Sequence, residues 1–172
     1  LIHSMGGGDE FVERDRRAAA NARDAADAAG VGRIVYLGGL GEDDEDLSTH
    51  LSSRHEVGRI LVSGDTPVTE LRAAIIIGSG SVSFEMLRHL TEVLPIMTTP
   101  AWVRTRCQPV AIRDILALLV RVLDDDTPGH RVLEVGGPDV LTYQDMMQVY
   151  ADVAGLRRRL IVPVPVLTPG LS

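Results

Sequence analysis

The chain has 172 residues, of which 45% are hydrophobic, and a formal net charge of −7 at pH 7. It is long enough for one domain with a sizeable core, and its negative charge argues against nucleic-acid binding, which needs a surplus of Lys and Arg on one face. The single Cys107 excludes an intrachain disulfide, no Cys/His cluster has metal-ligand spacing, and no apolar run approaches the roughly 20 residues that span a bilayer. We expect one soluble α/β domain without a metal, in a reducing, cytoplasmic setting.

The first half of the chain predicts alternating strands and helices. Residues 1–5 read as an apolar strand before a glycine triplet, and a helix is expected over residues 9–29, ended by Gly30. The face of this helix that packs on a sheet is expected to carry Ala18, Ala22, Ala25, Ala26 and Ala29. Residues 33–37, bounded by glycines, predict a buried parallel strand. After the acidic loop at 42–46, a second helix is expected to place its apolar side chains at Leu47, Leu51, Val57, Ile60 and Leu61.

The middle of the chain predicts a further strand and helix, and then an extended segment. The strand is expected within residues 67–77, and its β-branched run at 75–77 is predicted to be buried. A helix over about 81–93 carries Phe84, Leu87 and Leu90 at helical spacing. Residues 102–109 are expected to be extended up to a proline.

The last third begins with a strongly amphipathic helix. Its apolar positions are Ile112, Ile115, Leu116, Leu119 and Val122. A strand is expected at 131–135, and the pattern from Thr142 to Asp145 is that of a capping box opening a helix that ends at Gly155. Because strands and helices alternate throughout, the sheet is predicted to be mostly parallel with right-handed crossovers.

A short glycine pattern, Gly78-Ser79-Gly80-Ser81, lies between the strand and the helix of the middle region. It lacks the third glycine of a dinucleotide fingerprint, and no strand ending in Asp or Glu follows about 20 residues later. We interpret it as a tight turn into a capped helix. The three arginines at 157–159 are interpreted as solvated side chains on a turn.

Two segments together carry a family resemblance. Residues 32–41 read as a strand opening into a glycine-rich loop, and His50-Leu51-Ser52-Ser53-Arg54 follows on a helix. In order and spacing this resembles the short-chain dehydrogenase/reductase superfamily, where the strand ends at a catalytic serine and the helix carries Tyr-x-x-x-Lys. Here Gly38 or Gly39 stands for the serine, His50 for the tyrosine and Arg54 for the lysine.

Further motifs extend the resemblance over nearly the whole chain. Leu71 to Gly78 resembles the family's Leu-Arg-Pro-x-x-x-x-Gly stretch with Ala73 in place of proline, and 110–114 resembles its Val-x-x-x-Asp helix start. Residues 135–138, with Thr142 after them, resemble its late strand, turn and helix. The chain is most similar to the C-terminal part of atypical, extended members, near the NmrA-like and NAD-dependent epimerase-like groups.

The resemblance implies a partial doubly wound, Rossmann-like sheet with helices on both faces, lacking its N-terminal strands. Residues 1–78 would form the second half of the dinucleotide-binding fold and 79–172 the substrate-side segments of the same single domain, 1–172. The family's Gly-x-x-Gly-x-x-Gly loop is absent from this sequence, so we expect a fragment of a longer protein. Leu1–Met5 would be the fourth strand, whose unpaired apolar edge predicts self-association.

The resemblance also implies a cofactor, NAD or NADP, and a set of site residues. The cofactor would contact His3, Ser4, Met5, Gly38, Gly39, Arg54, Ala74, Ile75 and Ile76. The catalytic candidates are His50 and Arg54, and the substrate candidates are Phe84, Trp102 and Arg106. Each has a simpler interpretation: an exposed helix position for His50, core packing for the large apolar residues, and surface exposure for the arginine.

Two hypotheses about function therefore stay open at this point. The first is an oxidoreductase or epimerase-like enzyme that acts on a small molecule. The second is a regulatory module that senses NAD(P) without turning it over, and the replacement of all three catalytic residues favours it. A third possibility is a structural remnant that binds nothing.

Overall fold

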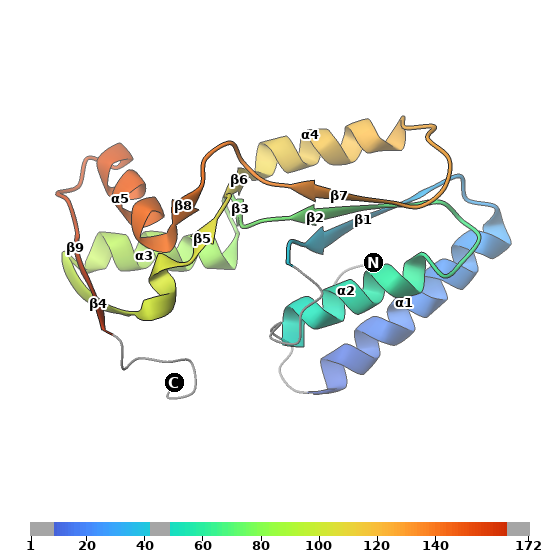
Figure 1. Cartoon of the computed structure of the whole chain (residues 1–172), viewed down its shortest axis with the longest axis horizontal. Helices are drawn as coiled ribbons and strands as arrows, with labels where there is room; N and C mark the ends of the chain where they lie inside the picture. Colours follow the sequence, from blue (N-terminus) through green and yellow to red (C-terminus); the bar gives the residue numbers. More distant parts are fainter. Residues whose placement is uncertain (1–8, 42–48, 165–172) are drawn as a thin grey trace. The chain divides into compact units, whose positions relative to one another are not determined.

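The computed structural model describes residues 9–41 and 49–164 (Figure 1). They fall into two compact units, one containing the residues up to Ala73 with Ile115–Val135, and the other Ala74–Asp114 with the residues from Gly136. The predicted strand at Leu1–Met5 and the acidic loop at 42–46 lie outside the described residues. Self-association through the edge of that strand, and the single domain over 1–172, stay predictions.

The first unit is built on a parallel sheet with the strand order β1-β2-β7. The strands are β1 (Ile34–Gly39), β2 (Val68–Ala73) and β7 (Arg131–Val135), and Leu71 lies opposite both Leu37 and Leu133. Helices α1 (Asp9–Ala29) and α2 (Thr49–Leu61) cover one face of the sheet, and α4 (Ile112–Leu123) covers the other (Figure 1). The predicted parallel sheet with helices on both faces is confirmed.

The core on the α1 and α2 side is made of small and medium-sized apolar residues: Ala19, Tyr36, Val57, Leu61 and Val68. The predicted alanine face of α1 is wrong in part, because Ala25 and Ala29 are exposed and Ala19 is buried instead. Helix α1 packs against α2 as well as the sheet, and its buried side carries Phe11, Asp15, Ala19 and Ala26, which are four or seven residues apart.

The predicted strand over 67–77 is interrupted. β2 ends at Ala73, and β3 (Ile76–Ile77) pairs instead with β6 (Val110–Ala111). The N–H of Val110 donates to the Ile75 carbonyl at 2.9 Å, so the backbone has left the main sheet by this point. Residues 75–77 are half-buried, which corrects the expectation that they are core.

The second unit packs α3 (Val82–Val93) against α5 (Tyr143–Val153). Beside them β4 (Ile96–Pro100) pairs in parallel with β9 (Leu160–Val164), and β5 (Arg106–Cys107) pairs antiparallel with β8 (Leu141–Thr142). Neither β4 nor β9 was predicted from the sequence. The segment at 102–109 is only partly extended, because a 3₁₀ turn occupies Ala101–Arg104.

Helix starts in the second unit differ in how they are capped. The predicted capping box is confirmed: the N–H of Asp145 donates to Thr142 Oγ1 at 3.1 Å, and the N–H of Thr142 donates to Asp145 Oδ2 at 2.9 Å. Ser81 is the N-cap residue of α3, but its hydroxyl donates to the Ile76 carbonyl at 2.9 Å. The turn at Gly80, with φ of 84°, is thus confirmed, but Ser81 caps no helical N–H with its side chain.

The three arginines at 157–159 do not behave alike. Arg157 and Arg158 are exposed, as expected. Arg159 is half-buried, and its Nε donates to the Thr91 carbonyl at 2.7 Å, which corrects the prediction for this residue. In the described part of the chain, no helix has the length and apolar character needed to cross a membrane.

Candidate functional site at the carboxyl end of β1

The end of β1 brings together three of the predicted site residues, Gly38, Gly39 and Arg54. A Cβ atom built on Gly39 would lie 2.6 Å from Leu51 Cδ1 and 3.7 Å from Arg54 Nη1, so the guanidinium is beside this glycine. A Cβ atom on Gly38 would lie 2.7 Å from Glu70 Oε1. Neither position accommodates a serine side chain unless its neighbours move.

Arg54 is a half-buried cation at this end of the sheet. Among residues 9–41 and 49–164, its guanidinium has no hydrogen bond or ion pair. Arginine presents five N–H donors in a planar fork, and an unbonded, partly buried fork is suited to an anionic or polyhydroxylated ligand. In open α/β sheets, ligands bind beyond the carboxyl ends of the strands, which is where Arg54 lies.

His50 lies on the same face of α2, one turn before Arg54. Its side chain is exposed, as the simpler interpretation expects. The imidazole stacks on Phe11 of α1, with the ring centroids 4.7 Å apart and an interplanar angle of 22°. One face of the ring is therefore held against α1.

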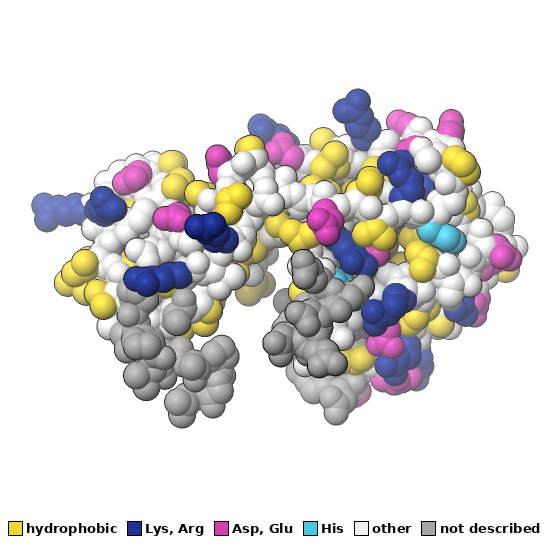
Figure 2. Space-filling view, viewed as in Figure 1, with side chains coloured by type: hydrophobic (Ala, Val, Ile, Leu, Met, Phe, Trp, Pro, Cys, Tyr) yellow, Lys and Arg dark blue, Asp and Glu magenta, His cyan; other side chains and the backbone are white. Residues whose placement is uncertain are grey.

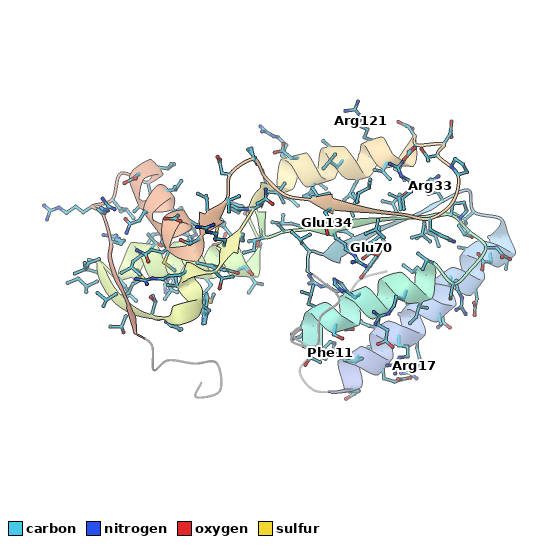
Figure 3. All side chains as sticks on the ribbon, in the orientation of Figure 1. Phe11, Arg17, Arg33, Glu70, Arg121 and Glu134 are labelled. Carbon is cyan, nitrogen blue, oxygen red and sulfur yellow. The ribbon has the colours of Figure 1, made fainter. Side chains whose placement is uncertain are left out.

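A buried carboxylate lies behind the glycines. Glu70 is 2% exposed and accepts a hydrogen bond from Arg72 Nε at 3.1 Å. Figure 3 shows Glu70 projecting from β2 toward α2. Its second oxygen lies 2.6 Å from where a Cβ on Gly58 would be, so glycines on β1 and α2 make room for one carboxylate.

Buried polar side chains of β1 and α2 bind backbone atoms of the opposite element. The hydroxyl of Tyr36 donates to the Arg54 carbonyl at 3.0 Å, and Nε2 of His55 lies 3.1 Å from the Gly39 carbonyl. Burial, with the nearby negative charge of Glu70, raises the pKa of Tyr36 well above its usual range. The phenol is therefore a protonated donor throughout the physiological pH range.

Glu70, Arg72 and His55 were not predicted as site residues. The signal in the sequence was a pair of charged residues at alternate positions of the strand Val68–Ala73, which places both on one face. Charged residues on a helix-covered face of a sheet need partners, and this requirement points to a buried ion pair.

The remaining predicted cofactor contacts lie in the second unit or outside the described residues. Ala74, Ile75 and Ile76 follow β2, belong to the second unit and are each half-buried. His3, Ser4 and Met5 lie outside the described residues. Among the described residues, no group of three or more His, Cys, Asp or Glu side chains is placed to hold a metal ion.

In the second unit, Phe84 lines an apolar cavity of about 200 Å³ between α3 and α5. Its ring meets Tyr150 edge-on, with the centroids 6.1 Å apart. The other lining residues are Ile77, Leu87, Leu141, Met146, Val149, Tyr150 and Val153. The other predicted substrate residues lie elsewhere: Trp102 is exposed and packs edge-on against Tyr143, and Arg106 is exposed on β5.

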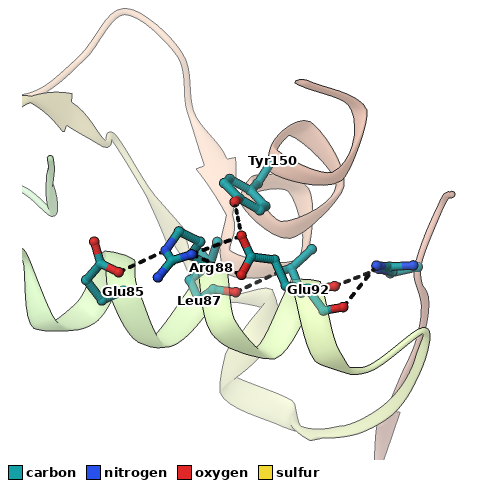
Figure 4. Close-up of polar contacts among 7 residues, drawn as sticks. Glu85, Leu87, Arg88, Glu92 and Tyr150 are labelled. Carbon is teal, nitrogen blue, oxygen red and sulfur yellow. Dashed lines mark hydrogen bonds and ion pairs between the residues drawn. The ribbon is translucent and has the colours of Figure 1, made fainter. Parts of the chain in front are cut away.

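A polar network ties the two helices that form this cavity (Figure 4). Arg88 donates to Glu85 at 2.8 Å and to Glu92 at 2.9 Å, and the Tyr150 hydroxyl donates to Glu92 at 2.5 Å. The hydrogen bond from Tyr150 lowers the pKa of Glu92, and the same bond raises the pKa of Tyr150. Each of these four side chains is bonded to at least one of the others, so the network is a structural brace between α3 and α5.

The surface charge follows no single pattern. On the face drawn in Figure 2, dark blue Arg side chains are interspersed with magenta Asp and Glu side chains.

No protein-family model and no curated protein matches the sequence. Solved structures do match. WbmG of Bordetella bronchiseptica, in complex with NAD and UDP, is 18% identical with a TM-score of 0.75; the match covers 99% of this chain and 63% of that one. DesIV, a dTDP-glucose 4,6-dehydratase from Streptomyces venezuelae with NAD bound, is 16% identical with a TM-score of 0.74, over 96% of this chain and 59% of that one.

MoeE5, in complex with UDP-glucose and NAD, is 18% identical with a TM-score of 0.73, over 91% of this chain and 59% of that one. The chain thus spans between 59% and 63% of the length of these three solved chains. At such low identities the likeness establishes the fold. The Rossmann-like fold implied by the resemblance to the short-chain dehydrogenase/reductase superfamily is confirmed.

Proposed function

We propose that the chain is part of an NAD(P)-binding protein of the oxidoreductase or epimerase-like type. The observation that carries this proposal is the guanidinium of Arg54 beside Gly39, at the carboxyl end of a parallel strand, where it is bonded to none of the residues that the structure describes. The support from outside the chain is that WbmG, DesIV and MoeE5 share its fold and were solved with NAD.

The described residues that fit a dinucleotide are those at the carboxyl end of β1. Arg54 would donate hydrogen bonds to ribose hydroxyls or to a phosphate oxygen, and Gly38 and Gly39 would present only backbone atoms to the cofactor. When bound, NAD or NADP would supply hydride transfer, and the chain's own part would be to bind and orient it. Gly38 and Gly39 are the remaining described contacts that we propose on β1.

A direct test titrates the 172-residue chain with NAD⁺, NADH, NADP⁺ and NADPH by isothermal calorimetry. We expect saturable binding of at least one of them. Arg54→Met should weaken it at least tenfold, since a hydrogen bond to a charged group is worth about 1.5–3 kcal/mol. Arg17→Met is the matched control, because Arg17 is an exposed arginine on α1. Absence of binding by all four cofactors would refute the proposal.

We propose a small-molecule substrate, and nucleotide-linked sugars are the first compounds to test because MoeE5 was solved with UDP-glucose. Phe84 is the most favourable of the predicted substrate contacts, since it lines a cavity. Trp102 and Arg106 are retained as proposed contacts on exposed surface. If turnover is found, His50→Ala should lower it about a hundredfold, as expected for loss of a general acid or base. An unchanged rate would remove His50 from the mechanism.

A non-catalytic, NAD(P)-sensing regulatory module is the second candidate. Two observations favour it: the space at Gly38 and Gly39 is filled by Glu70 and Leu51, and the ring of His50 is stacked on Phe11. Cofactor binding without consumption over a broad panel of nucleotide sugars would support this alternative. Consumption of cofactor with any substrate would eliminate it.

A further inference from the structure

We propose that Tyr36 and His55 are positioning residues that hold the guanidinium of Arg54 beside Gly39. This inference rests on the proposed function, because it names the residues that position the Arg54 guanidinium for binding the cofactor. The two residues lie on different elements, Tyr36 in β1 and His55 in α2, and each binds a backbone carbonyl of the other element.

The two hydrogen bonds run in opposite directions between β1 and α2. The Tyr36 hydroxyl reaches from the strand to the carbonyl of Arg54 itself, and the His55 ring reaches from the helix to the carbonyl of Gly39. A carbonyl oxygen only accepts, so Nε2 of His55 must carry the proton. The pair therefore fixes both the position of α2 along the strand and its rotation about its own axis.

The peptide group that follows Gly39 is held at both of its polar atoms. Its oxygen accepts from His55, and its N–H, which belongs to Leu40, donates to the Ala73 carbonyl of β2 at 2.8 Å. The strand end is thus bonded to the helix on one side and to the neighbouring strand on the other. The backbone beside the Arg54 guanidinium is therefore hydrogen-bonded to both α2 and β2.

Burial makes the two bonds costly to lose. Tyr36 is 5% exposed and His55 is 1% exposed. Water does not replace either donor at such positions, so removing one leaves a buried carbonyl with a poorer set of partners. The helix should then shift relative to the strand, and the fork of Arg54 with it.

The variants that test this inference separate the hydrogen bond from packing. His55→Leu removes the donor, whereas His55→Gln retains an N–H at the place of Nε2. Tyr36→Phe removes only the hydroxyl. Val68→Ala is the control for stability, because Val68 belongs to the same core cluster as Tyr36 and its apolar side chain forms no hydrogen bond.

The first measurement is the dissociation constant of the cofactor that binds the unaltered chain most tightly. His55→Leu and Tyr36→Phe should raise it roughly tenfold, as expected for the loss of one buried hydrogen bond. His55→Gln should restore the dissociation constant to within about twofold of the value for the unaltered chain. Val68→Ala should lower the melting temperature but leave the dissociation constant unchanged. Equal effects of His55→Leu and Val68→Ala on the dissociation constant would overturn the inference. So would a folded His55→Gln variant that binds the cofactor no more tightly than His55→Leu.

The second measurement needs no cofactor, so the inference can be tested even if the proposed function fails. The Nε–H resonance of Arg54 is identified by its loss in Arg54→Met. In the unaltered chain and in His55→Gln, the chemical shift of this Arg54 resonance should differ from that of the exposed Arg17. In His55→Leu and Tyr36→Phe, the chemical shift of the Arg54 resonance should move toward that of Arg17. A resonance unchanged in both variants would mean that neither residue positions Arg54.

Discussion

The carboxylate of Glu70 occupies the space into which a side chain at position 38 would project. Oε1 of Glu70 lies 2.7 Å from the ideal Cβ position on Gly38, closer than real Cβ contacts allow. Glu70 is almost fully buried and bonded to Arg72, so moving it would break a buried ion pair. The buried position of the Glu70 carboxylate therefore requires a glycine at position 38.

Gly38→Ala should therefore destabilise the first unit by about 1–3 kcal/mol, the usual cost of overpacking a core. Gly38→Ser should lower the unfolding free energy by at least as much, and it should not create a catalytic serine. In a Glu70→Ala background the cost of Gly38→Ala should fall, because the obstructing oxygen is gone. Urea unfolding of the four proteins in this double-mutant cycle measures the coupling free energy.

Gly32→Ala is the control, since a Cβ there meets nothing within 4 Å. Equal costs at positions 32 and 38 would contradict the prediction.

Adjacent residues of α4 should differ sharply when truncated. Ile115 is 0% exposed and Leu116 is 55% exposed, although the sequence predicts both as apolar positions of one amphipathic helix. Ile115→Ala should cost about 2–5 kcal/mol of unfolding free energy, whereas a surface substitution such as Leu116→Ala should stay within about 0.5 kcal/mol. Urea titrations of the two variants measure both values. Similar costs would show that the outer side of α4 is covered in solution.

Gly137 is enclosed by backbone. A Cβ atom on it would collide with the Pro109 carbonyl oxygen, and its own N–H donates to the Gln108 carbonyl at 3.2 Å. A backbone atom cannot rotate away as the end of a side chain can, so Gly137→Ala should disrupt the second unit. Hydrogen exchange followed by mass spectrometry should show faster exchange in α5 and β8 for this variant. Unchanged exchange there would contradict the prediction, and Gly32→Ala again serves as the control.

The capping box of α5 predicts a dependence of stability on pH. The Thr142 hydroxyl, followed by its backbone N–H, lowers the pKa of the Asp145 carboxyl in the folded chain. A carboxyl whose folded pKa is depressed stabilises the fold above its unfolded pKa of about 3.9. This contribution is lost as the pH falls through the lower, folded value. The stability difference between the unaltered chain and Asp145→Asn should thus be present at neutral pH and vanish in strong acid.

Thermal melts of both proteins over this pH range measure that difference, and Asp152→Asn is the control because Asp152 is an exposed residue at the other end of α5. A difference that persists in strong acid would contradict the prediction. Thr142→Ala should cost about 1 kcal/mol at neutral pH, as is usual for loss of an N-cap side chain.

Local patterns in the sequence determined most helices and the parallel sheet. The bounds of α1 and β7 and the capping box of α5 were predicted closely, because caps, glycine stops and apolar periodicity act over a few neighbouring residues. The resemblance also placed His50 and Arg54 on one helix after a strand that ends in glycines, and the structure has this arrangement.

Only the tertiary structure decided which extended segments became strands and which polar side chains met. Ile96 of β4 pairs with Leu160 of β9, far along the chain, and neither segment has a local pattern that names its partner. For the same reason the sequence did not reveal that Glu70 fits between Gly38 and Gly58. A hydrogen bond or a close contact depends on atoms brought together by the whole fold, whereas helix caps and periodicity depend on residues that are already neighbours in the chain.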